Sequence, residues 1–160
     1  MLNEQIRAEI AKYVEAEYVA NRLSPVIMDG EDCAVCDDVT PYSIPIPQRG
    51  ETFSQMVMRL ITKKGMKNSE VYGNVFMTRQ VFHSMKSNEN YQPTKNTAIL
   101  FAIALKLSLD EAKDLLLRAG YTFSPGILSD MVVSACLTHH IYDTVEINIM
   151  LDDYGCNPLC

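Results

Sequence analysis

Residues 71–88 read VYGNVFMTRQVFHSMKSN, and their apolar side chains recur at helical spacing on both sides of a short break. The pattern predicts two short helices, from about Ser69 to Val75 and from about Thr78 to Ser87, joined by a tight turn. Thr78 suits the first position of the second helix, because its hydroxyl can accept a hydrogen bond from a free backbone N–H. The residues of this helix that we expect to face the core are Val81, Phe82 and Met85.

Helix patterns continue on both sides of this pair. Thr52-x-x-Gln55 is a capping-box pair that opens a helix, and Gly65 is suited to end it. A strongly apolar helix is expected from Thr94 to Leu107. A second capping box opens a helix from Leu109 to Arg118. Residues 52–122 therefore read as five helices.

The two ends of the chain add three further helices. An amphipathic helix is predicted over residues 2 to about 21, and a segment rich in proline follows it up to Gly50. Two more helices are expected, about Ile127 to His139 and Thr144 to Tyr154. No run alternates with period two, so the fold class is all-α. We divide the chain into 1–51 (N-terminal helix and connector), 52–122 (five-helix domain) and 123–160 (C-terminal helical extension packed on that domain).

Composition narrows the class of protein. The chain has 160 residues, of which 48% are hydrophobic, enough for a real core. No apolar run reaches the roughly 18 residues that span a bilayer. The first charges are Glu4 and Glu9, without the basic start and apolar block of a secretory signal. We expect a cytoplasmic protein with no membrane partner.

Charge is unevenly distributed along the chain. The net charge is −6, but residues 52–122 hold 10 basic and 5 acidic side chains. Residues 1–51 hold 4 basic and 10 acidic, and residues 123–160 hold 5 acidic and no basic side chains. A basic segment that coincides with the paired short helices favours a nucleic-acid partner. The alternative is that Lys63, Lys64 and Lys67 only solvate helix faces.

From about Thr52 to Arg118 the sequence resembles the lambda repressor and Cro-like helix-turn-helix superfamily. The resemblance is carried by MTRQVF at 77–82 and IALKLSLDE at 103–111. It implies a five-helix repressor-like core, double-stranded DNA as partner, and a role as a transcriptional regulator of bacterial or phage origin. Dimers are common in such proteins. The chain is also similar to an uncharacterised bacterial C-terminal helical module, which implies no established biochemistry.

The resemblance implies a set of DNA contacts. The second short helix would enter the major groove, where Arg suits guanine and Gln suits adenine. Helix starts and basic side chains would hold phosphates. The residues expected to read bases are Arg79, Gln80, His83 and Ser84. The residues expected to hold phosphates are Gln55, Thr78, Lys86, Thr94 and Lys95.

Two positions depart from the family pattern. Tyr72 stands where relatives place a small residue so that the two helices pack closely. Phe76 stands at the turn position, commonly Gly or Asn because φ is positive there. These residues predict a changed angle between the helices or a longer turn. They also favour an alternative function, a helical adaptor that binds another protein and not DNA.

The remaining candidate sites are weaker. Cys33, Cys36, Cys156 and Cys160 could in principle surround a Zn²⁺ ion, but their spacing is irregular, and we expect reduced thiols and no metal or cofactor. Cys136 precedes the pair His139-His140 without the orienting group that a nucleophile needs, so we expect no enzyme. The apolar face of the N-terminal helix either packs on its own chain or forms a homodimer.

Overall fold

The computed structural model describes residues 4–22, with side chains up to Ala16, and residues 50–159. In these ranges every regular element is a helix, which confirms the all-α prediction. The helices are α1 (Glu4–Arg22), α2 (Phe53–Lys64), α3 (Asn68–Gly73), α4 (Arg79–Ser87), α5 (Lys95–Ala104), α6 (Leu109–Arg118), α7 (Leu128–Thr138) and α8 (Thr144–Asp153).

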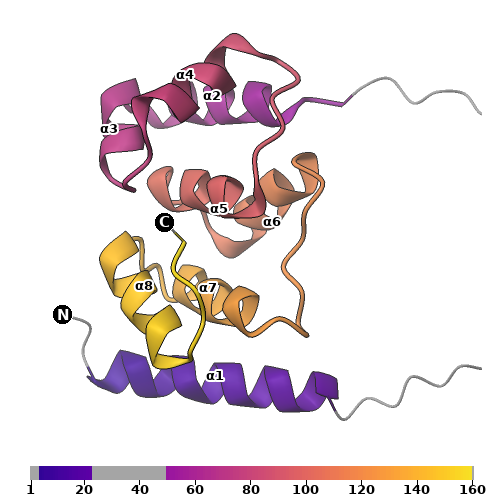
Figure 1. Cartoon of the computed structure of the whole chain (residues 1–160), viewed down its shortest axis with the longest axis vertical. Coiled ribbons are helices and arrows are strands. Elements are labelled where there is room, and N and C mark those ends of the chain that lie inside the picture. The colour runs from indigo at the N-terminus through magenta and orange to yellow at the C-terminus, as the bar shows by residue number, and fades with distance from the viewer. Residues whose placement is uncertain (1–3, 23–49, 160) are drawn as a thin grey trace, which may run out of the picture.

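The helices stack in tiers along the long axis of the molecule (Figure 1). α2, α3 and α4 form the top tier, α5 and α6 the next, and α7 and α8 the third, while α1 lies across the bottom. A single cluster of buried hydrophobic residues runs through all four tiers, from Ile10 and Val14 of α1 to Phe82 and Met85 of α4. The C-terminal helices thus share one core with the preceding five.

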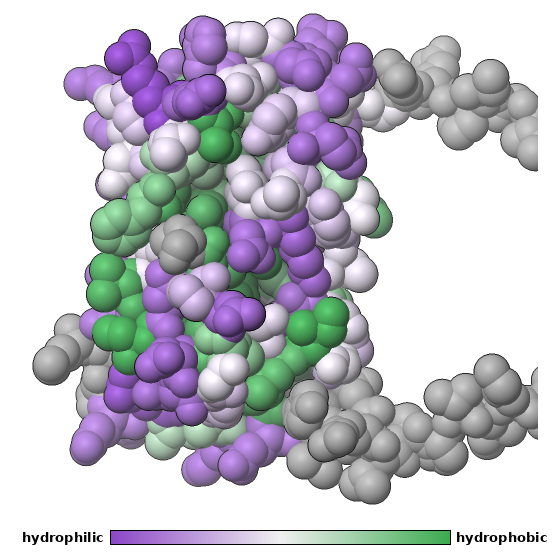
Figure 2. All heavy atoms as spheres, viewed as in Figure 1, coloured by the Kyte–Doolittle hydropathy of each residue, from purple (hydrophilic) through white to green (hydrophobic). Residues whose placement is uncertain are grey.

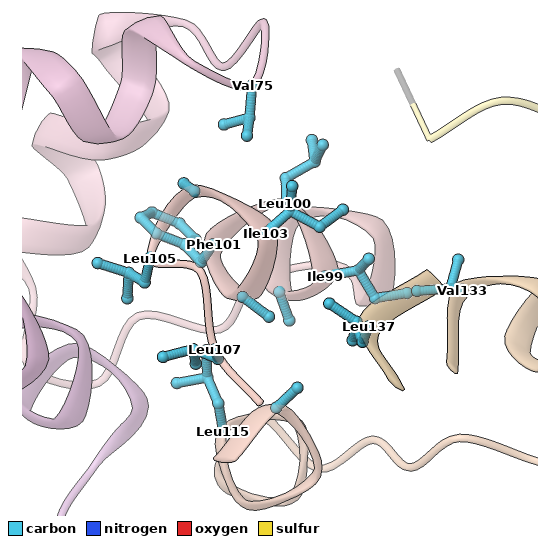
Figure 3. Close-up of a cluster of buried hydrophobic side chains, with 14 of the residues drawn as sticks. Val75, Ile99, Leu100, Phe101, Ile103, Leu105, Leu107, Leu115, Val133 and Leu137 are labelled. Carbon is cyan, nitrogen blue, oxygen red and sulfur yellow. The ribbon is translucent and has the colours of Figure 1, made fainter. Parts of the chain in front are cut away.

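The middle of this core is α5. Its residues 98–104 are all buried, so the helix is covered on every side. Toward the top tier, the Phe101 ring lies 5.6 Å from the Phe53 ring and 6.3 Å from the Phe82 ring, measured between centroids. Toward α7, the side chain of Ile99 points to Val133 and Leu137 (Figure 3). The uninterrupted apolar run in the sequence is explained by this position between two tiers.

Capping side chains set the starts of the helices where the sequence predicts them. Thr52 with Gln55, and Ser108 with Glu111, form complete capping boxes at α2 and α6. Gly65 follows α2 in the left-handed conformation, with φ of 63°, as expected for a helix-ending glycine. These local signals explain why the helix ends lie within a few residues of the predicted ones.

The N-terminal helix packs on its own chain. α1 lies against α7, and Ile10 and Val14 are buried in that contact. At its edges, Arg7 Nη2 lies 3.5 Å from an Asp153 oxygen, and Glu9 Oε2 lies 3.9 Å from His139 Nδ1. Of the two roles expected for the apolar face of this helix, the structure shows the intramolecular one.

Replacing Phe101 with alanine should remove the contact between α5 and the top tier. The ring is fully buried, so the loss of its contacts and the cavity left behind should lower the free energy of unfolding by about 3–5 kcal/mol. Urea denaturation followed by circular dichroism measures this change. Leu117→Ala is the control, because Leu117 is 69% exposed and its loss should change stability by at most about 0.5 kcal/mol. Equal effects of the two substitutions would contradict the central role of α5.

Candidate nucleic-acid interface

The top tier contains two short helices in the arrangement that the sequence predicts. α3 ends at Gly73, and α4 begins at Arg79 after its N-cap, Thr78. The Thr78 hydroxyl accepts a hydrogen bond from the Val81 N–H at 3.4 Å. Five apolar side chains of the two helices and their connection are buried in the core, namely Val71, Val75, Met77, Phe82 and Met85. α4 is therefore fixed by one face only.

The turn between α3 and α4 keeps a backbone conformation that usually requires glycine. Phe76 has a φ of 53°, although a bulky side chain is disfavoured in this left-handed region. Its side chain is also 68% exposed, so burial does not compensate for the strained backbone. Phe76 thus adopts the positive φ for which glycine or asparagine is usual, and phenylalanine is unusual here both for its backbone and for its exposure.

Tyr72 joins α3 to α4 through an aromatic contact. The Tyr72 ring lies against the Phe82 ring, with centroids 5.7 Å apart and planes tilted by 56°. The Tyr72 side chain is half-buried against the core. An aromatic pair thus links the two helices.

The outer face of α4 is polar and open to solvent. All four predicted base-reading residues, Arg79, Gln80, His83 and Ser84, are exposed and lie together on this helix. Lys86 is also exposed, and α4 contains no acidic residue. The upper part of the molecule in Figure 2 is covered largely by hydrophilic side chains. One interaction is internal to the helix, because His83 Nε2 lies 3.5 Å from Ser87 Oγ.

The predicted phosphate ligands divide into two groups. Gln55 and Thr78 are exposed residues of the top tier, at the starts of α2 and α4. The Gln55 Oε1 atom already accepts from the Thr52 N–H at 3.1 Å, so a phosphate would have to use the Gln55 amide nitrogen. Thr94 caps α5 in the next tier, accepting from the Thr97 N–H.

The side chain of Lys95 on α5 forms an ion pair with a residue of α7. Its Nζ lies 2.5 Å from a carboxylate oxygen of Asp130, whose side chain is only 5% exposed. The same oxygen accepts a hydrogen bond from the Ser124 N–H at 2.7 Å. Lys95 thus neutralises a buried carboxylate and joins α5 to α7. The sequence offered no sign of this pair, because 35 residues separate its members.

Three basic side chains lie where α2 ends and α3 begins. Lys63 and Lys64 lie in the last turn of α2, and Lys67 precedes α3. Lys64 Nζ donates to the carbonyl oxygen of Lys106 at 3.0 Å, which places the exposed turn after α5 beside this end of α2. Lys106 was not among the predicted site residues. The contact between Lys106 and Lys64 depends on how α5 and α2 lie relative to each other, which no local sequence pattern predicts.

Not every basic residue of this tier is available to a ligand. Arg59 Nε lies 2.6 Å from Glu51 Oε1, and the guanidinium lowers the pKa of that carboxyl below its usual value. Arg118 also binds this residue, donating from Nη1 to the Glu51 carbonyl oxygen at 2.6 Å. Arg59 and Arg118 thus stabilise the start of α2.

Cys136, Cys156, His139 and His140 lie in or beside α7 and α8, apart from this surface. Cys33, Cys36 and Cys160 are outside the described residues, and among the described residues no three metal-ligating side chains gather. Cys136 is buried, and burial raises the pKa of its thiol to about 12. His139 packs at the end of α7, and His140 is exposed.

No helix within residues 4–22 and 50–159 is long and apolar enough to cross a membrane. Comparison of the chain with protein-family models, with curated proteins and with solved structures gave no match.

Replacing Phe76 with glycine should relieve the strained turn. Glycine adopts positive φ without a steric penalty, so the free energy of unfolding should rise by about 1 kcal/mol. Phe76→Ala is the matched control, because it removes the ring and keeps a β-carbon in the disfavoured region. Chemical denaturation of both variants measures the difference. Equal stability of the glycine and alanine variants would show that the backbone carries no strain.

Replacing Lys95 with methionine should leave Asp130 buried without its cation. We expect a loss of about 2 kcal/mol in the free energy of unfolding, because a buried charge has lost its partner. Lys86→Met on exposed α4 should change stability by at most about 0.5 kcal/mol. The double variant Lys95→Met/Asp130→Leu should recover part of the loss. A double variant less stable than Lys95→Met would contradict this account of the pair.

Proposed function

We propose that this chain binds double-stranded DNA through α4 and acts as a transcriptional regulator. The observation that carries the proposal is the division of α4 into two faces. Phe82 and Met85 fix the helix to the core, while its polar side chains are exposed together on the outside. A helix held in this way can enter a major groove without disturbing the fold. On this proposal, α2 to α6 form a repressor-like helix-turn-helix core.

The exposed side chains have the chemistry that base recognition needs. The Arg79 guanidinium can donate two parallel hydrogen bonds to O6 and N7 of guanine, and the Gln80 amide can pair with N6 and N7 of adenine. His83 and Ser84 lie one turn further along the same helix and can donate to or accept from neighbouring base edges. These four residues would supply sequence preference.

Phosphate contacts would come from the rest of the top tier. Residues 50–90 contain six basic and three acidic side chains, although the chain as a whole is acidic. Lys86, Thr78 and Gln55 can contact phosphates beside the groove, and Thr94 can do so from the start of α5. Lys95 contributes less in this proposal, because Asp130 already neutralises it. The acidic residues of the remaining helices would limit non-specific attraction between DNA and the other faces of the protein.

A second candidate is a protein adaptor with the same fold. The specific observation in its favour is Phe76, a large hydrophobic side chain that is exposed at the tip of the turn. A groove-binding function does not require such a residue. In this alternative the top tier binds another protein, and α4 does not enter a DNA groove. In neither candidate does the chain act as an enzyme.

Fluorescence anisotropy with a mixed-sequence duplex tests the DNA proposal. Wild-type binding should weaken by orders of magnitude between about 50 and 200 mM salt, because phosphate contacts release counterions. A duplex library should then yield a preferred sequence. On the preferred sequence selected from this library, Arg79→Ala/Gln80→Ala should weaken binding at least about tenfold, since it removes two base-reading side chains.

The matched control is Lys113→Ala, which removes an exposed positive charge on α6, away from the top tier. It should leave the affinity close to that of wild type. If Lys113→Ala weakens binding as much as the α4 variant, the attraction is a general charge effect and the α4 interface is wrong. Wild type that fails to bind both the mixed duplex and the library at 50 mM salt would favour the adaptor.

A further inference from the structure

A cavity of about 480 Å³ lies where α5, α7 and the C-terminal segment 155–159 meet. Its apolar wall includes Ile99 and Val133, and Figure 3 shows the side chain of Ile99 pointing to Val133. Leu159 borders the cavity from the C-terminal segment, and its N–H donates to Asn148 Oδ1 on α8 at 2.9 Å. The cavity is thus formed by three parts of the chain that pack together, and its volume is in the range of pockets that bind small molecules.

The ion pair between Lys95 and Asp130 lies in the wall of this cavity. Among the described residues, these are the only two charged side chains that line it. The buried carboxylate of Asp130 accepts hydrogen bonds from Lys95 Nζ and from the Ser124 N–H, so its charge is already compensated inside the protein. The Lys95 ammonium has three donor protons, of which Asp130 accepts one, and the Lys95 side chain is still 26% exposed. Lys95 can therefore donate to a second anion in the cavity.

The backbone around the ion pair adds positive potential. α5 begins at Lys95 and α7 begins at Leu128, and both of these residues line the cavity. The N-terminal end of a helix carries a partial positive charge. Ile127, the N-cap of α7, forms no side-chain cap, so the N–H groups of the first turn of α7 can donate to a ligand. Because the charges of Lys95 and Asp130 balance each other, the two helix starts leave the cavity positive.

We propose that this cavity binds a small carboxylate with an apolar chain, its carboxylate against Lys95 and the start of α7 and its chain against Ile99 and Val133. An uncharged ligand would cover the Lys95 ammonium without pairing its remaining protons, which is unfavourable. A cation would be repelled by Lys95 and by both helix starts. An anion without a chain would leave the apolar wall in contact with water. This inference does not depend on DNA binding, because no residue that lines the cavity belongs to α2, α3 or α4.

Titration of the full chain with four small probes, followed by two-dimensional amide NMR, tests the proposal. Sodium octanoate should shift the amide signals of Ser129 and Val133 in a saturable way, since both residues line the cavity. Octanoate should bind at least about tenfold more tightly than 1-octanol, which has the same chain without the charge. It should also bind at least about tenfold more tightly than acetate, which lacks the chain. Octylammonium should produce no saturable shift of these signals.

Two variants locate the site. Lys95→Met/Asp130→Leu removes both charges without leaving either one buried alone, and it should abolish the preference for octanoate over 1-octanol. Ser129→Trp places a large side chain in the cavity from the half-buried first turn of α7 and should block octanoate even if the double variant fails to fold. Lys86→Met, on α4, is the control and should bind octanoate as wild type does.

Three results would overturn the proposal. The first is wild type that gives no saturable shift with octanoate up to about 10 mM, well beyond the range of a weak specific site. The second is equal affinity of wild type for octanoate and 1-octanol, which would remove the role of Lys95. The third is octanoate binding that Ser129→Trp leaves unchanged, because the ligand would then occupy another part of the protein.

Discussion

The burial of α5 between two tiers is the constraint on which the rest of the structure depends. One side of the helix packs against α2 and α4 through Phe101, and the other packs against α7 through Ile99. α6 joins the same tiers, because it contacts both α2 and α7, so the position of α4 is set by a core that also includes the C-terminal helices. The short helices α3 and α4 are too short to be stable alone and obtain their order from this packing.

The same constraint separates the residues of α4 that stabilise the fold from those that we propose bind a partner. The apolar side of α4 belongs to the shared core, and its polar side contributes little to that core. Substitution on the outer face can therefore change what the protein binds without changing the fold. The exception is the turn at Phe76, where a strained backbone and an exposed ring coincide. Strain of this kind persists only where the surrounding structure enforces it.

Local signals in the sequence predicted most of the helix boundaries, because capping boxes and apolar spacing act within a few residues. Thr52 with Gln55 and Ser108 with Glu111 are such capping boxes. The exposure of Arg79 could be predicted because the buried apolar residues of α4 lie on another face of that helix. The Lys95–Asp130 pair was missed, and so was the position of Lys106 beside Lys64. These contacts join residues distant in sequence and depend on the stacking of whole helices, which periodicity does not report.

The docking of α1 has a consequence for how the protein behaves on dilution. α1 is joined to the other helices only through residues 23–49, yet it covers one side of α7. Its association is a first-order equilibrium, with an effective concentration set by the connecting segment and on the order of millimolar for a short tether. The docked fraction of the helix therefore does not depend on protein concentration, whereas the occupancy of the site by a free peptide of the same sequence would depend on how much peptide is added. Cleavage within the connecting segment would convert a permanent part of the core into a dissociable ligand.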